Sequence, residues 1–118
     1  LPKAEVDESG GSKLGFIASG SADPAVQEAR ALLRKAGIES DYLRIRSIPF
    51  NDEVGEFIKR HEKIAVVEIN RDGQLHQLLK IQYPVEAYRM ISLAHLDGLP
   101  LNARWVEEKV RSLKEVEA

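Results

Sequence analysis

The apolar positions of this chain gather in short runs, and the run at residues 64–67 predicts the core of the fold. It reads Ile-Ala-Val-Val without a polar interruption. A run this short, rich in β-branched residues, is typical of a strand buried on both faces, as in a parallel sheet. Residues 70–73 (Asn-Arg-Asp-Gly) then predict a turn. Leucines at 75, 78 and 79 follow at helical spacing, so this stretch predicts a strand, a polar loop and a helix.

The same alternation of strand-like and helix-like patterns runs along the whole chain. Further strands are predicted at residues 4–7, 14–18, 42–48 and 89–93. Helices are predicted after Asp23-Pro24, after Asn51 and after Asn102, with Asp23 as a cap and Gly37 as the stop of the first helix. Arg44 and Arg46 share one face of their strand and predict a half-wet strand near the sheet edge. Strands alternating with helices predict an α/β fold with a mainly parallel sheet.

Composition narrows the classes of function. The 118 residues suffice for one domain, and a formal net charge of −2 gives no reason to expect nucleic acid or an anionic membrane as a partner. The absence of cysteine excludes disulfides, thiol catalysis and cysteine-ligated iron–sulfur clusters within the chain. No apolar stretch approaches the ~20 residues of a membrane span. The start Leu-Pro-Lys carries neither a methionine nor a signal-peptide pattern, so we expect a piece of a longer, cytoplasmic chain.

Glycine and serine patterns give little evidence of phosphate chemistry. The glycines at 10, 11 and 15 precede a strand, whereas a dinucleotide-binding fingerprint needs its glycines between strand and helix. Ser19-Gly20-Ser21 does lie between strand and helix, where free N–H groups can hold an anion. No lysine or glycine-rich cradle follows, so a plain tight turn is the favoured interpretation, and neither serine has the setting of a hydrolase nucleophile.

The three histidines, His61, His76 and His95, have no metal-ligand spacing to one another. We predict that His61, at the end of a helical stripe, packs against the core. We predict that His76 lies on a solvated or partner-facing surface. The sequence therefore predicts no metal site and no catalytic residue.

Glu68 is the polar residue that the strand pattern singles out, because it ends an otherwise apolar strand, where a carboxylate needs a partner or water. Two interpretations stay open: hydrogen bonds to nearby loop N–H groups, or an ion pair or hydrogen bond across a subunit interface. Asn70, Gly73 and Gln74 are divided in the same way between turn chemistry and recognition. Together with Ser21, these residues form the candidate interface or ligand loop.

Four segments, taken in order, resemble a known family. They are residues 20–25 (Gly-Ser-Ala-Asp-Pro-Ala), 48–50 (Ile-Pro-Phe), 66–75 (Val-Val-Glu-Ile-Asn-Arg-Asp-Gly-Gln-Leu) and 97–101 (Asp-Gly-Leu-Pro-Leu). From about residue 14 to about residue 110, the chain resembles the C-terminal region of the α subunit of 2-oxoacid:ferredoxin oxidoreductases. The Glu-x-Asn-x-x-Gly-Gln pattern at 68–74 is the most specific part of the resemblance.

The resemblance implies a transketolase C-terminal-like fold. That fold is a three-layer α/β/α sandwich on a five-stranded, mostly parallel sheet with strand order 1-3-2-4-5 and an antiparallel edge strand. On this basis residues 1–12 form the edge strand and a flexible joint, and residues 13–118 form the domain. The arginine-bearing strand would then lie beside the edge strand.

The resemblance also implies a place in an enzyme. The family's enzymes oxidatively decarboxylate 2-oxoacids on thiamine diphosphate, with Mg and an iron–sulfur cluster, form acyl-CoA and reduce ferredoxin. The thiamine diphosphate is held mainly by the β subunit together with an upstream domain of the α chain. The resemblance therefore carries over no catalytic residue and implies an assembly role for this chain. Its partners would be the β subunit and the upstream domains of the α chain. In isolation the chain would have no activity and no bound cofactor.

A stand-alone small-ligand or receiver-like module is the alternative, since it shares the alternation of strands and helices. A receiver needs an acidic cluster at the ends of its first and third strands, whereas the first central strand here ends in Ser19-Gly20-Ser21.

Overall fold

The computed structural model describes residues 5–8, 12–19, 22–46, 50, 52–68, 74–94 and 103–117. Its elements, in chain order, are β1 (Glu5–Asp7), β2 (Leu14–Ser19), α1 (Asp23–Lys35), β3 (Asp41–Ile45), α2 (Asp52–Lys59), β4 (Lys63–Glu68), α3 (Gln74–Gln82), the 3₁₀ helix η2 (Pro84–Arg89), β5 (Met90–Ala94) and α4 (Ala103–Glu117). The five predicted strands are all present, with bounds shifted by one to three residues. Within the described ranges, none of the helices is both long and apolar enough to cross a bilayer.

The sheet has five strands in the order β1-β3-β2-β4-β5. β1 runs antiparallel to β3, and the other three pairs are parallel. β2 and β4 are the inner strands of the parallel part, as the continuous apolar run at residues 64–67 predicts. The strand order and the single antiparallel edge that the family resemblance implies are confirmed.

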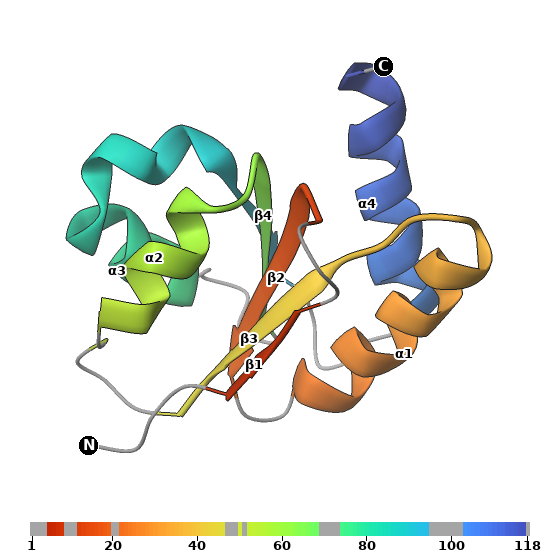
Figure 1. Ribbon diagram of the computed structural model, residues 1–118, viewed down its shortest axis with the longest axis horizontal. Coiled ribbons are helices and arrows are strands. Elements are labelled where there is room, and N and C mark those ends of the chain that lie inside the picture. The colour runs from red at the N-terminus through yellow and green to blue at the C-terminus, as the bar shows by residue number, and fades with distance from the viewer. Residues whose placement is uncertain are drawn as a thin grey trace.

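Two helices cover each face of the sheet, which gives three layers (Figure 1). Alternate strand residues point to opposite faces and divide the core in two. Under α1 and α4 lie Phe16, Ala18, Tyr42, Ala65, Val67 and Leu93, packed on Val26, Ala29, Leu33, Val106 and Val110. Under α2 and α3 lie Ile17, Leu43, Ile64 and Val66, packed on Val54, Phe57, Ile58, Leu75 and Leu79. The fold is a three-layer α/β/α sandwich.

The predicted half-wet character of the third strand is wrong. The first three residues of β3 are buried, and Leu43 is 0% exposed. The reason is that β1 covers the outer edge of β3 while helices cover both of its faces. Its arginines behave as predicted only at the end of the strand, where Arg44 is half-buried near Asp23 and Arg46 is exposed.

The local sequence predicted the C-terminal end of α1 correctly but not its N-terminal cap. Asp23 is the first helical residue rather than the cap, and the cap position, Ala22, offers no side-chain hydrogen bond. The C-terminal stop is confirmed: Gly37 has φ +84°, and its N–H donates to the Arg34 carbonyl at 3.0 Å. The Ile38 N–H donates to the Leu33 carbonyl at 2.9 Å, which completes a Schellman motif.

Arg30 fastens α1 to the edge of the sheet. Its side chain is 3% exposed. It donates to the Ser40 hydroxyl at 3.0 Å, to the Ser40 carbonyl at 2.7 Å and to the Asp7 carboxylate at 2.9 Å. Because Asp7 belongs to β1, this buried guanidinium holds the short edge strand against the rest of the domain.

Candidate functional site

The Glu68 carboxylate ends β4 and caps the helix that follows. One of its oxygens, Oε1, accepts a hydrogen bond from the Leu75 N–H at 2.6 Å, and Oε2 accepts one from the His76 N–H at 3.1 Å. Both bonds satisfy donors in the first turn of α3 that have no partner within the helix. The geometry corresponds to the first of the two interpretations, hydrogen bonds to nearby N–H groups. The interface role of Glu68 stays a prediction.

Of the five residues of the predicted loop, the structure describes two. Gln74 is the first residue of α3 and its side chain is exposed. Ser21, Asn70 and Gly73 lie outside the described residues. The backbone that Glu68 holds is therefore that of Leu75 and His76, directly after Gln74.

His76 is half-buried, and its place on a solvated or partner-facing surface stays a prediction. Its Nε2 atom is buried and has no hydrogen-bond partner among the described residues. Burial lowers the pKa of His76 below its usual 6.5, and the charge of Lys80 lowers it further. A backbone hydrogen bond with Met90 and the charge of Glu68 act in the opposite direction. The neutral imidazole is therefore the form that the folded protein favours.

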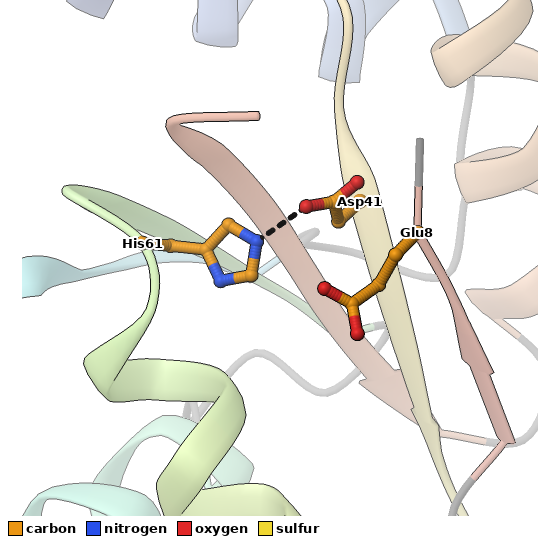
Figure 2. Close-up of side chains that lie close together, drawn as sticks. All are labelled: Glu8, Asp41 and His61. Atoms are coloured by element: carbon orange, nitrogen blue, oxygen red, sulfur yellow. Dashed lines mark hydrogen bonds and ion pairs between the residues drawn. The ribbon is translucent and has the colours of Figure 1, made fainter. Parts of the chain in front are cut away.

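A second group of polar side chains lies at the amino-terminal ends of the parallel strands, opposite the end where Glu68 lies. Asp41 opens β3, His61 lies two residues before β4, and Glu8 follows β1. Figure 2 shows the three side chains converging, with potential ligand atoms within 4.8 Å of one another. His61 and Asp41 are each 1% exposed, and His61 Nε2 lies 2.7 Å from Asp41 Oδ2.

Both ring nitrogens of His61 have hydrogen-bond partners. Its Nδ1 is 2.6 Å from the Phe57 carbonyl oxygen, which can only accept, so Nδ1 carries a hydrogen. The short contact from Nε2 to Asp41 needs a hydrogen as well. Both ring nitrogens of His61 and the Oδ2 atom of Asp41 are thus engaged in hydrogen bonds inside the fold.

Carboxylates and imidazole are suitable ligands for a divalent cation, but this group is satisfied without one. Glu8 Oε1 accepts a hydrogen bond from the Arg60 guanidinium at 2.9 Å, and Asp41 is paired with His61. Arg89 also donates to the His61 carbonyl at 2.8 Å. In open α/β sheets, ligands bind at the carboxyl ends of the strands, which is the end opposite to this group. The arrangement fastens the end of α2 to β1 and β3.

Gly15 makes the pairing of His61 with Asp41 possible. β2 lies between β3 and β4, and Gly15 is the β2 residue paired with Asp41 on one side and with Ile64 on the other. A Cβ at Gly15 would lie 3.1 Å from His61 Cγ and 2.9 Å from the nearest atoms of Ile64 and Phe57. The missing side chain leaves the space through which His61 reaches across β2. Gly15 lies within β2 rather than before a strand, which corrects the prediction, and packing but no partner was predicted for His61.

No protein-family model matches the sequence. The 2-oxoglutarate oxidoreductase subunit KorA of Mycobacterium tuberculosis (strain ATCC 25618 / H37Rv) is 33% identical over 88 residues, which cover 73% of this chain and 13% of KorA. This chain thus spans only a small part of that relative.

Solved structures with the same fold include two oxidoreductases and a transketolase. A 2-oxoglutarate:ferredoxin oxidoreductase from Magnetococcus marinus, solved with 2-oxoglutarate, coenzyme A and succinyl-CoA bound, gives a TM-score of 0.82 at 22% identity and covers 95% of this chain and 20% of its own. The α chain of a probable 2-oxoacid ferredoxin oxidoreductase from Thermoplasma acidophilum gives 0.59 at 18% identity, covering 94% and 96%. A split-gene transketolase, an inactive β4 tetramer, gives 0.65 at 18% identity, covering 93% and 40%.

The strand order, the antiparallel edge and the two helices on each face make this a transketolase C-terminal-like domain. The chain belongs to the 2-oxoacid:ferredoxin oxidoreductases, within which it corresponds to the C-terminal domain of the α subunit.

Two features of the chain bear on the cofactors of that family. Iron–sulfur clusters are held by cysteine, and the chain has none. A diphosphate would favour a helix N-terminus at the carboxyl edge of the sheet. The N-terminus of α3 is already occupied by the Glu68 carboxylate. The first turn of α1 carries Asp23, which accepts a hydrogen bond from the Tyr42 hydroxyl at 2.8 Å. The first turns of α1 and α3 thus each have a carboxylate where a diphosphate would bind.

Proposed function

We propose that the chain is the assembly domain of a 2-oxoacid:ferredoxin oxidoreductase α subunit. The parent enzyme oxidatively decarboxylates a 2-oxoacid to acyl-CoA and reduces ferredoxin. The observation that carries this proposal is the 33% identity to KorA over 88 residues. The alternative, a stand-alone small-ligand or receiver-like module, is not favoured by these similarities.

The proposed partners are the thiamine-diphosphate-binding β subunit and the upstream domains of the same α chain, with ferredoxin as the electron acceptor of the complex. Thiamine diphosphate, Mg and the iron–sulfur cluster belong to those other parts of a cytoplasmic enzyme. The carboxylates at the N-termini of α1 and α3 and the lack of cysteine support this division, because they disfavour a diphosphate at those two helix ends and exclude a cysteine-held cluster within the chain. Residues 13–118 make up the proposed domain, which is inactive alone. Ser21, Glu68, Asn70, Gly73 and Gln74 are its proposed interface loop.

The proposal is tested by reconstituting the enzyme. The complete α subunit is expressed with its β subunit, and 2-oxoacid-dependent reduction of a viologen dye is followed with coenzyme A and thiamine diphosphate present. Acyl-CoA is measured by mass spectrometry. We expect dye reduction by the complex, none by this chain alone, and none by a complex whose α subunit lacks residues 13–118. Full activity and full assembly of that truncated complex would overturn the proposal.

A further inference from the structure

The large apolar side chains that remain exposed are concentrated in one part of the described structure. Exposed fractions are 77% for Ile81, 81% for Val85, 70% for Tyr88 and 41% for Leu78, and all four lie on α3 and η2. The fifth exposed large apolar residue among those described, Val6, is 39% exposed on β1 at the other edge of the sheet. We call Leu78, Ile81, Val85 and Tyr88 the α3–η2 face.

The spacing of these residues gives each element an apolar outer side. Leu78 and Ile81 are three residues apart in α3, while Leu75 and Leu79 supply the buried side of that helix. Val85 and Tyr88 are also three residues apart, which in a 3₁₀ helix places them one above the other. α3 and η2 pack against each other, so the exposed residues belong to neighbouring surfaces.

Polar groups border this apolar surface. Lys80 is exposed on α3, and Arg89 pairs with Glu86 at 2.6 Å within η2. The Arg89 guanidinium lies 5.1 Å from the centre of the Tyr88 ring. An apolar centre that contains a tyrosine and has charged groups at its rim is the usual composition of a protein–protein interface.

The size of the face indicates what kind of partner it suits. Four such side chains expose on the order of 500 Å², which is within the range of the largest apolar patch on a typical monomer, and such patches are often functional. A stable complex of two separate molecules buries roughly 800 Å² on each partner, so the four side chains alone would make up only part of such an interface. Contacts between covalently linked domains need less area, because the linkage keeps the local concentration high.

We propose that the α3–η2 face is the surface on which the remainder of the same α subunit docks. This inference rests on the proposed function, and it names the partner and the residues that meet it. Two of the relatives matched here carry much more chain than this domain, which covers 13% of KorA and 20% of the Magnetococcus marinus chain, whereas it covers 96% of the Thermoplasma acidophilum α chain. The face is therefore an intramolecular domain contact in the full subunit.

The first test compares the 118-residue chain with the assembled enzyme by hydrogen–deuterium exchange. We expect amides of residues 78–88 to exchange at least tenfold more slowly in the assembled enzyme, because the docked polypeptide excludes water. Equal exchange in the two samples would overturn the inference.

Chemical cross-linking from Lys80 in the same complex identifies the occupant. Isotope-mixed α subunits distinguish links within one chain from links between copies. Links from Lys80 to upstream residues of its own chain are expected. Links to the β subunit or to a second α subunit in their place would overturn the inference.

Variants separate docking from folding. Val85→Glu in the full-length α subunit should remove the slowed exchange at residues 78–88 and lower dye reduction at least tenfold. The same change in the 118-residue chain should leave its melting temperature within about 2 °C, because Val85 is 81% exposed. Val6→Glu, at the opposite edge of the sheet, is the matched control and should leave both readouts unchanged.

If Val85→Glu behaves like Val6→Glu in an active complex, the docking face is wrong while the proposed function stands. If the truncated complex is fully active, the proposed function itself fails.

Discussion

Glu68 shows how a single carboxylate can end a buried strand at little cost in free energy. Its two oxygens replace water with the N–H groups of Leu75 and His76. Truncation in Glu68→Ala leaves both donors unsatisfied, and we expect the free energy of unfolding to fall by about 1–2 kcal/mol in urea titrations. Gln74→Ala, at the exposed neighbouring position, should change it by less than about 0.5 kcal/mol. Equal stability of the two variants would show that the cap contributes nothing.

His76 makes the stability of the domain depend on pH. Because its folded-state pKa is lower than the usual 6.5, its contribution to stability is present above pH 6.5 and is lost as pH falls through the folded value. Urea titrations at pH 7.5 and pH 5.5 should show a larger loss of stability for the wild type than for His76→Gln. The same loss in both proteins would mean that other groups carry this pH dependence.

Gly15 is the glycine whose missing side chain the packing requires. A methyl group there meets Phe57 and Ile64 at 2.9 Å and His61 at 3.1 Å. We expect Gly15→Ala to lower the free energy of unfolding by about 1–3 kcal/mol, the usual cost of overpacking a core. Gly55→Ala is the comparison, because its Cβ would meet the ring of the partly buried Tyr83 at 2.8 Å rather than residues inside the core, and alanine favours the helix. Thermal melts of the two variants test the difference.

At the scale of secondary structure, the Asp41–His61 pair joins two elements that the sequence separates by 20 residues. Removing one side chain of the pair leaves the other buried without its partner. Asp41→Asn and His61→Gln should therefore each lower the free energy of unfolding by about 3 kcal/mol. The double variant should cost at least about 1 kcal/mol less than the sum of the two singles. Strict additivity in this double-mutant cycle would show that the two groups are not coupled.

Local features of the chain predicted local features of the fold. The apolar run of β4 and the Gly37 stop of α1 were predictable because each depends on a few adjacent residues. Asp23 was assigned to the cap because Asp-Pro is a common helix start, but it lies one residue inside the helix and binds Tyr42. The burial of β3 was missed because it depends on β1, a strand that is distant in sequence from β3.

The candidate site was likewise predictable only where it depends on adjacent residues. The contact of Glu68 with nearby N–H groups was one of two open interpretations, since the strand pattern alone showed that the carboxylate needed a partner. The group around His61 was not predictable from spacing, because Glu8, Asp41 and His61 meet only when β3 and β4 flank β2. A residue pattern read along one segment carries no information on which strand lies beside it.

At the scale of the whole molecule, one sheet supports both cores. β2 and β4 contribute alternate residues to each, so damage to one face should weaken the other. We expect Val110→Asp, on the α4 side, to speed the exchange of amides in α2 by the same factor as those in α1, with a single unfolding transition by calorimetry. Protection that persists in α2 alone would show that the faces unfold separately.

The two edges of the sheet will differ in how they meet other chains. β1 is three residues long, and the acids around it, Asp7 and Glu8, are held in place by Arg30 and Arg60. Short, charged edge strands resist pairing with a foreign strand. β5 is the other outer strand, is five residues long and directly follows η2 with its exposed apolar residues. Aggregation of the separated domain at high concentration should therefore begin at β5, and solubilising substitutions belong on η2 rather than on β1.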